Sequence, residues 1–307
     1  MGYVPDQRAQ SMRTNRTMTV GLLVPDLRNP YFADLVASVE DDLYRQGVST
    51  LIGTSSESVE KQDAFINNLL GQRIDGAIVV PQGVDSPGMR ALTACGMPLV
   101  FVDRRVPGID EVPFVVSDPV PGIQSALDSL TNLGHRRIGY VAHPSLGSFS
   151  VDERASAFHA LSSKRLPDGD CPIVECDETC DSRRRALDKL LEAGVTAIIC
   201  GYSPDMITMV GLLAERGIRI GEDLSAISFD DIDGFRLMVP QISVISQQAD
   251  HMGHLGVETL LRHMRKHKKA NITEHADDIR YVPTVYMERT SVGPVPYAAR
   301  TKPAGVP

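Results

Sequence analysis

Apolar, β-branched segments alternate with amphipathic helical patterns along almost the whole of this 307-residue chain. Residues 20–24 form a continuous apolar run, which is typical of a strand buried on both faces of a parallel sheet. Asn29 and Pro30 then provide a helix-start signal. The apolar face that follows has helical spacing and ends at Gly47, and its members are Phe32, Leu35, Val36, Val39 and Leu43. Short loops between such elements predict right-handed βαβ units and a doubly wound α/β fold.

The alternation falls into two series. The first has predicted strands at 20–24, 48–54, 76–80, 98–103 and 114–117, with later helices at 58–70, 87–95 and 121–133. The second begins after Gly134, with strands at 137–142, 172–176, 196–201 and 225–229 and helices at 152–164, 182–193 and 204–216. A helix at 249–267 and a strand near 279–287 follow, and residues 292–307, with four prolines, are predicted to be a disordered tail. Two α/β halves predict a ligand cleft at the carboxyl ends of their strands.

The charge balance and cysteine content argue against several classes of protein. With 31 basic and 39 acidic residues the net charge is −8, so the body of the chain is not expected to hold DNA alone. Five cysteines form an odd, scattered set, which favours reduced thiols and a cytoplasmic location over a disulfide framework. No apolar run approaches the ~20 residues of a membrane span, and no secretory signal is recognisable.

No pattern in the sequence indicates catalysis, a cofactor or a metal. A Gly-x-Ser-x-Gly elbow, a phosphate-binding loop and a dinucleotide glycine pattern are all missing, so we expect no enzyme. Cys171, Cys176 and Cys180 lack zinc-knuckle spacing. His263 and His267 lie in a basic run, which is best explained as a solvated helix end.

Six segments resemble the LacI/GalR family of transcriptional regulators, in the family's order and spacing. They are LRNPYF (27–32), QRIDG (72–76), PLVFVDR (98–104), LGHRRIGY (133–140), GEDLSAISFDD (221–231) and VPT (282–284). The resemblance implies two doubly wound parallel-sheet subdomains, periplasmic-binding-protein-like, joined by three crossovers around a ligand cleft. The implied subdomains are 17–134 plus 248–276 and 135–247 plus 277–291.

Residues 1–16 resemble the family's hinge between its DNA-binding headpiece and its core. The segment is short, basic and helix-capable, and it is too short to stay helical alone. The resemblance places a helix-turn-helix immediately before Gly2, and we expect this sequence to be the core of such a regulator with the hinge as a remnant and the headpiece missing. It assigns hinge contacts to DNA to Arg8, Ser11, Met12 and Arg13, with Met12 as an apolar wedge in the minor groove.

The resemblance also implies a set of ligand-binding positions. These are Asn29, Tyr31, Phe32, Asp103, Arg154, Tyr202, Ser203, Asp230 and Gln247. Arg154 matches a family arginine that forks onto ligand hydroxyls or carboxylates. Tyr202 and Ser203 depart from the usual Asn-Asp pair, and Glu178 stands where purine-binding members have a second aromatic residue. A sugar or sugar-like polyol is therefore the first expectation for the effector, and a purine the second.

The resulting hypothesis is a ligand-responsive transcriptional regulator of the repressor type, with this chain as its effector-binding and dimerisation core. It implies a cytoplasmic homodimer with a small-molecule effector and operator DNA as partners, without a cofactor or membrane contact. The alternative is an exported sugar-binding protein of a transporter, which shares the fold. The hinge and the cysteine usage favour the regulator.

Overall fold

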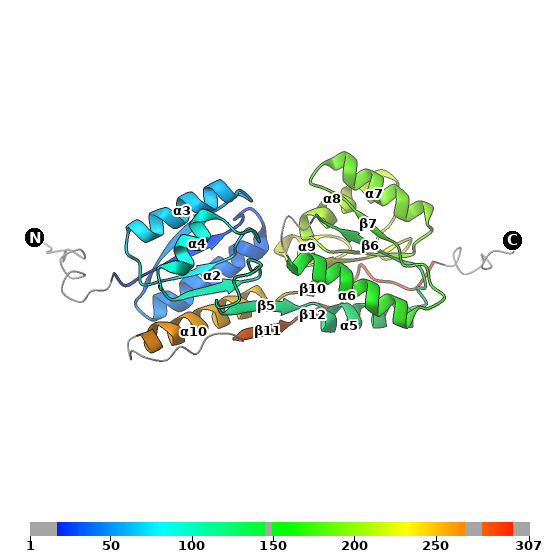
Figure 1. Cartoon of the computed structure of the whole chain (residues 1–307). Helices are drawn as coiled ribbons and strands as arrows, with labels where there is room; N and C mark the ends of the chain where they lie inside the picture. The colour runs from blue at the N-terminus through cyan, green and yellow to red at the C-terminus, as the bar shows by residue number, and fades with distance from the viewer. Residues whose placement is uncertain (1–16, 145–148, 268–277, 297–307) are drawn as a thin grey trace, which may run out of the picture. The chain divides into compact units, whose positions relative to one another are not determined.

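The computed structural model describes residues 17–144, 149–267 and 278–296, and these residues form two α/β units. Unit 1 contains 17–116, 249–267 and 278–282, and unit 2 contains 117–144, 150–248 and 283–296. In each unit helices cover both faces of a six-stranded sheet (Figure 1). The predicted fold class, two parallel-dominated sheets in a periplasmic-binding-protein-like arrangement of elements, is confirmed.

Unit 1 has the strand order β11-β5-β4-β3-β1-β2. Its strands are β1 (Thr19–Val24), β2 (Ser49–Thr54), β3 (Gly76–Val79), β4 (Leu99–Val102), β5 (Phe114–Asp118) and β11 (Ile279–Pro283), of which β1 to β5 are mutually parallel. Helices α2 (Pro30–Arg45) and α10 (Ala249–His267) pack on one face. Helices α3 (Val59–Gly71) and α4 (Pro87–Ala94) pack on the other.

Unit 2 has the strand order β12-β10-β9-β8-β6-β7. Its strands are β6 (Ile138–Ala142), β7 (Ile173–Glu175), β8 (Ala197–Cys200), β9 (Ser225–Phe229), β10 (Ser243–Ser246) and β12 (Val285–Met287), and only the β10–β12 pair is antiparallel. Helices α5 (Val120–Asn132) and α6 (Phe149–Arg165) pack on one face. On the other face lie α7 (Cys180–Glu192), α8 (Ser203–Glu215) and the short α9 (Asp233–Leu237).

The local sequence explains the conformation of the loop between β1 and α2. The β1 segment is buried from Val20 to Val24, as its uninterrupted apolar character predicts. The Asn29 side chain caps α2 by accepting a hydrogen bond of 3.1 Å from the Tyr31 backbone N–H, and Pro30 occupies the first turn. This start places Tyr31 and Phe32 directly at the carboxyl end of β1.

The unit boundaries differ from those predicted from the sequence. Helix α5 belongs to unit 2 rather than to the first subdomain, because its apolar face packs on the strands of unit 2. The predicted strand 279–287 is divided into β11 and β12 at Thr284. The Thr284 hydroxyl accepts a 3.0 Å hydrogen bond from the Gly122 N–H and donates a 2.8 Å bond to the Asp118 carbonyl. Because β12 pairs with β10 in unit 2, the chain changes sheet at this point.

The predicted disordered tail begins too early. Val292 packs against the core of unit 2, and the Val295 N–H donates a 3.1 Å hydrogen bond to the Leu133 carbonyl. The Gly293 carbonyl lies 2.9 Å from Nε2 of His135. The prediction is therefore wrong for residues 292–296, while 297–307 lie outside the described residues.

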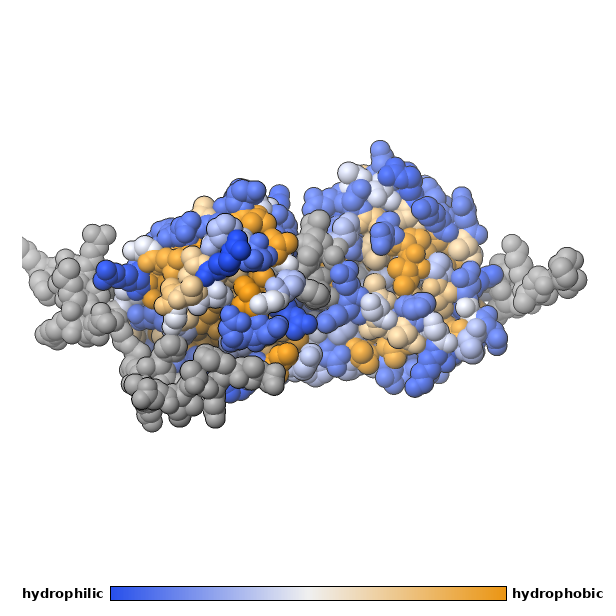
Figure 2. All heavy atoms as spheres, viewed as in Figure 1, coloured by the Kyte–Doolittle hydropathy of each residue, from blue (hydrophilic) through white to orange (hydrophobic). Residues whose placement is uncertain are grey.

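The face of the described chain that is drawn in Figure 2 is largely polar. In this view hydrophilic residues predominate on both units, and each unit also shows smaller apolar patches among its hydrophilic residues. No helix among the described residues has the length and apolar character needed to cross a bilayer.

Candidate functional site

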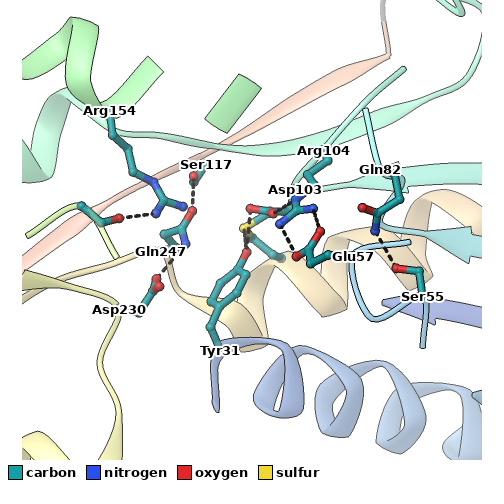
Figure 3. A network of polar contacts seen from close by, with 12 residues as sticks. Tyr31, Ser55, Glu57, Gln82, Asp103, Arg104, Ser117, Arg154, Asp230 and Gln247 are labelled. Carbon is teal, nitrogen blue, oxygen red and sulfur yellow. Dashed lines mark hydrogen bonds and ion pairs between the residues drawn. The ribbon is translucent and has the colours of Figure 1, made fainter. Parts of the chain in front are cut away.

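In unit 1, Tyr31 and Asp103 meet at the carboxyl edge of the sheet. The Tyr31 hydroxyl donates a 3.2 Å hydrogen bond to Oδ1 of Asp103, which directly follows β4 (Figure 3). Both side chains are buried, and Phe32 packs edge-on to Tyr31 with ring centroids 5.0 Å apart. Both predicted aromatic residues are thus core residues of unit 1. Asn29 is also buried, and its side chain serves as the helix cap.

Further polar side chains at this edge were not in the predicted ligand set. Arg104 forms a bidentate ion pair with Glu57 at 2.8 and 3.0 Å, and its guanidinium lies 5.8 Å from the centroid of the Phe32 ring. Gln82 donates a 2.5 Å hydrogen bond to the Ser55 hydroxyl. These residues follow β4, β2 and β3, and their position just beyond strand ends is the signal that could have found them.

In unit 2, Gln247 joins Ser117 to Asp230. The Ser117 hydroxyl donates a 2.7 Å hydrogen bond to Oε1 of Gln247, and Nε2 of Gln247 donates a 2.7 Å bond to Oδ1 of Asp230 (Figure 3). All three side chains are buried. The two bonds fix the orientation of the amide, since its oxygen accepts and its nitrogen donates. Ser117 was absent from the predicted set because it lies within β5 rather than after it.

Arg154 is a buried cation near the end of β8. It is 4% exposed, NH1 donates a 2.8 Å hydrogen bond to the Gly201 carbonyl, and its guanidinium carbon lies 4.7 Å from the centroid of the Phe229 ring. Nε of Arg154 has no hydrogen-bond partner among the described residues. A buried donor in this state is costly, so the site is suited to a ligand that accepts hydrogen bonds.

Tyr202 and Ser203 begin α8 beside Arg154. The Tyr202 ring packs on the imidazole of His143 with centroids 4.4 Å apart. The Ser203 hydroxyl is fully buried and has no partner among the described residues. Tyr202 therefore contributes an aromatic face, and Ser203 a buried hydroxyl, to the carboxyl edge of the unit 2 sheet near Arg154.

Asp103, Asp230 and Gln248, which follow strands on these edges, have left-handed backbone conformations. The φ angles are 63° at Asp103, 64° at Asp230 and 57° at Gln248. Such conformations are uncommon outside glycine, and they collect where the surrounding structure fixes a functional geometry. Two of the three positions belong to the predicted ligand set.

A second buried polar cluster lies in unit 2 and was not predicted. His143, Cys176 and Asp205 bring one potential ligand atom each to within 4.8 Å of one another. Nδ1 of His143 is 3.0 Å from Oδ2 of Asp205, and Nε of Arg183 donates a 2.8 Å hydrogen bond to Oδ1 of the same carboxylate. Burial, followed by the nearby Asp205 carboxylate, raises the pKa of the Cys176 thiol to about 12.

The predicted residues are thus gathered separately on each unit. Unit 1 joins Tyr31 to Asp103, and unit 2 joins Asp230 to Gln247 and holds Arg154 at the end of β8. The predicted hinge residues lie outside the described residues, and these are Arg8, Ser11, Met12 and Arg13.

Together these edges define a class of protein. Parallel sheets with buried carboxylates, amides, a guanidinium and aromatic rings at their carboxyl ends are typical of α/β proteins that bind small polar molecules. Residues 127–292 match the family model of the periplasmic binding protein-like domain. The chain belongs to this family.

Comparisons with individual proteins indicate which proteins of this family the chain resembles. The chain is 27% identical over 269 residues to catabolite control protein A of Priestia megaterium, covering 87% of this chain and 81% of that protein. It is 27% identical over 300 residues to the HTH-type transcriptional repressor PurR of Escherichia coli O1:K1, covering 96% and 86%. A probable LacI family transcriptional regulator from Corynebacterium glutamicum has a structure with a TM-score of 0.78 at 26% identity, covering 90% and 99%. These homologues are transcriptional regulators of the LacI family, which supports the regulator over the solute-binding alternative.

Proposed function

We propose that this chain is the effector-binding core of a LacI-family transcriptional repressor, and that its effector is a sugar or sugar-like polyol. The observation that carries the proposal is Arg154, a buried guanidinium with a donor unpaired among the described residues. Arg154 lies in helix α6 of unit 2, and two strands of the same unit are followed directly by Asp230 and Gln247. Carboxylate and amide oxygens accept hydrogen bonds from hydroxyls, and Arg154 donates to an oxygen.

Aromatic surface supports the same ligand class. Tyr202 is the residue whose ring can cover an apolar face of a sugar, since it begins α8 and is only half-buried. Glu178, which stands where a purine-binding site needs a second aromatic residue, is exposed and lacks a ring. A purine therefore remains the second candidate.

In this proposal the effector acts by population shift. A ligand that binds one arrangement of the core more tightly than another changes the fraction of protein able to bind operator DNA. The segment with Arg8, Ser11, Met12 and Arg13 is proposed to contact DNA in a cytoplasmic homodimer. No catalytic step and no cofactor enters this mechanism.

A ligand screen tests the effector class. Thermal unfolding of the full chain is measured with a panel of monosaccharides, polyols and purine bases, and we expect a monosaccharide or polyol to raise Tm. A purine that raises Tm while every sugar and polyol leaves it unchanged would contradict the proposed class.

Molecular mass separates the regulator from the transporter alternative. A regulator that reads a two-fold symmetric operator functions as a dimer, whereas an exported solute-binding protein acts as a monomer. We expect light scattering at micromolar protein to give twice the chain mass of 33.4 kDa. A monomer under these conditions would favour the solute-binding protein.

A further inference from the structure

We propose that His143, Cys176 and Asp205 form a binding site for one divalent transition-metal ion of the Zn²⁺ type. The cluster combines an imidazole nitrogen, a thiol sulfur and a carboxylate oxygen within 4.8 Å of one another. Mixed nitrogen, sulfur and oxygen donors suit Zn²⁺ and Co²⁺, while Mg²⁺ and Ca²⁺ require oxygen ligands. This inference is independent of the proposed effector and of DNA binding.

The scaffold brings these donors together from three rigid elements. His143 directly follows β6, Cys176 directly follows β7, and Asp205 lies in the first turn of α8. Strands β7, β6 and β8 are neighbours in the sheet, and α8 starts just after β8. Sites built on strand ends and a helix turn hold ligand geometry more tightly than sites on long loops.

The spacing is close to what a tetrahedral ion needs. Zn–N and Zn–O bonds of about 2.1 Å place two such ligand atoms about 3.4 Å apart. Nδ1 of His143 and Oδ2 of Asp205 are 3.0 Å apart, a hydrogen bond in which Nδ1–H donates to the carboxylate. On ion binding the ring proton moves to Nε2, and the lone pair of Nδ1 becomes available to the metal. With a Zn–S bond of about 2.3 Å, the sulfur belongs about 3.6 Å from the other two donors. The 4.8 Å limit of the cluster leaves at most about 1.2 Å for the Cys176 side chain to close.

Arg183 orients the carboxylate as an outer-shell partner does. Its Nε bonds Oδ1 of Asp205 and so leaves Oδ2 directed toward His143. Hydrogen bonds of this kind to a ligating carboxylate are a regular feature of metal sites. The positive charge of Arg183 opposes the cation, and the Cys176 thiolate that forms on binding offsets it.

The three side chains of the cluster are largely shielded from solvent. The side chains of Asp205 and His143 are 0% and 9% exposed, and Cys176 is 2% exposed. A thiol ligates a metal as the thiolate, so ion binding at Cys176 releases one proton from the thiol. Three donors gather among the described residues, so water or an anion completes the coordination.

A bound ion would also act on the neighbouring candidate effector residue. The His143 ring packs on Tyr202. Coordination through Nδ1 fixes the plane of the imidazole and therefore the surface against which Tyr202 rests.

Cobalt titration of the full chain tests the proposal directly. Metal-free protein is titrated with Co²⁺, and we expect a thiolate-to-cobalt charge-transfer absorption in the near ultraviolet that saturates at one ion per chain. Added Zn²⁺ is expected to abolish the absorption by displacement. Absence of this absorption in the folded wild-type protein would overturn the proposal without any variant.

Matched cysteine variants locate the site. Cys176→Ser is expected to lose the absorption and to weaken Zn²⁺ binding at least about 100-fold, and Asp205→Asn at least about tenfold. Cys180→Ser, which changes an exposed thiol of the same unit, should leave both unchanged. Far-ultraviolet circular dichroism checks that each variant is folded. An absorption that survives Cys176→Ser, or that disappears in Cys180→Ser, would show that the ion binds elsewhere.

Discussion

Asp103 and Asp230 occupy corresponding positions in the two units. Each directly follows a central parallel strand, each is buried, and their φ angles of 63° and 64° are nearly identical. Aspartate tolerates this left-handed conformation better than most residues, because its short polar side chain bonds locally. Both units therefore present a carboxylate at the same point of the sheet, in the same strained backbone geometry.

Substitution of these aspartates tests whether their backbone conformation is the reason that aspartate occupies both positions. Asp103→Asn and Asp230→Asn should change the free energy of unfolding by less than about 1 kcal/mol, because asparagine also tolerates the left-handed region. Asp103→Val and Asp230→Val should each cost about 1–3 kcal/mol. Urea unfolding measures the difference. Equal costs for asparagine and valine would show that the backbone conformation is not the reason for aspartate.

A glycine pair tests the packing of α5 on unit 2. A Cβ at Gly122 would lie 2.5 Å from Cγ2 of Ile245 and 2.6 Å from Oγ1 of Thr284, so Gly122→Ala should destabilise the protein by about 1–3 kcal/mol. Gly211→Ala is the matched control in α8, where a Cβ meets nothing within 4 Å, and it should stabilise by about 0.5–1 kcal/mol. The same sign for both substitutions would refute the packing argument.

The pH dependence of stability should report on His135. Burial lowers the pKa of His135, whose ring nitrogens contact Thr196 and the Gly293 carbonyl. The folded state therefore favours the neutral ring, and its contribution is complete above the ordinary value of 6.5 and is lost as the pH falls below it. Tm should fall between pH 7.5 and 5.5, and by less in His135→Gln. An equally steep fall in that variant would exclude His135 as the cause.

The elements of the fold could be predicted because their signals are local. Continuous apolar runs identify buried parallel strands, and Asn29 with Pro30 identifies a helix start. The boundary between the units could not be predicted in this way, because the apolar face of α5 fits either sheet and only packing decides. The division of strand 279–287 depends on Thr284, whose bonds to Gly122 and Asp118 are tertiary.

The candidate site could be predicted only in part. Strand-end residues such as Asp103 and Gln247 follow recognisable strands, and the family resemblance added Arg154. Ser117 lies inside a strand, where a polar residue carries no signal in the sequence. The cluster of His143, Cys176 and Asp205 joins two strand ends and the first turn of a helix that are far apart in the sequence, so spacing along the chain gives no sign of it.

The role of Arg154 is the centre of the functional account. Loss of hydrogen bonds from a charged group costs about 1.5–3 kcal/mol, and each 1.4 kcal/mol is about tenfold in affinity. Arg154→Ala should therefore bind the effector about 10- to 100-fold more weakly. Arg184→Ala is the matched control in the same unit, since the Arg184 side chain is 42% exposed and pairs with Glu215 at 3.0 Å.

Isothermal titration calorimetry tests this most directly, using the monosaccharide or polyol that raises Tm most in the screen. We predict that wild-type protein and Arg184→Ala bind this compound equally well, and that Arg154→Ala loses 10- to 100-fold in affinity. Unchanged affinity in a folded Arg154→Ala protein would contradict the assignment of the effector site.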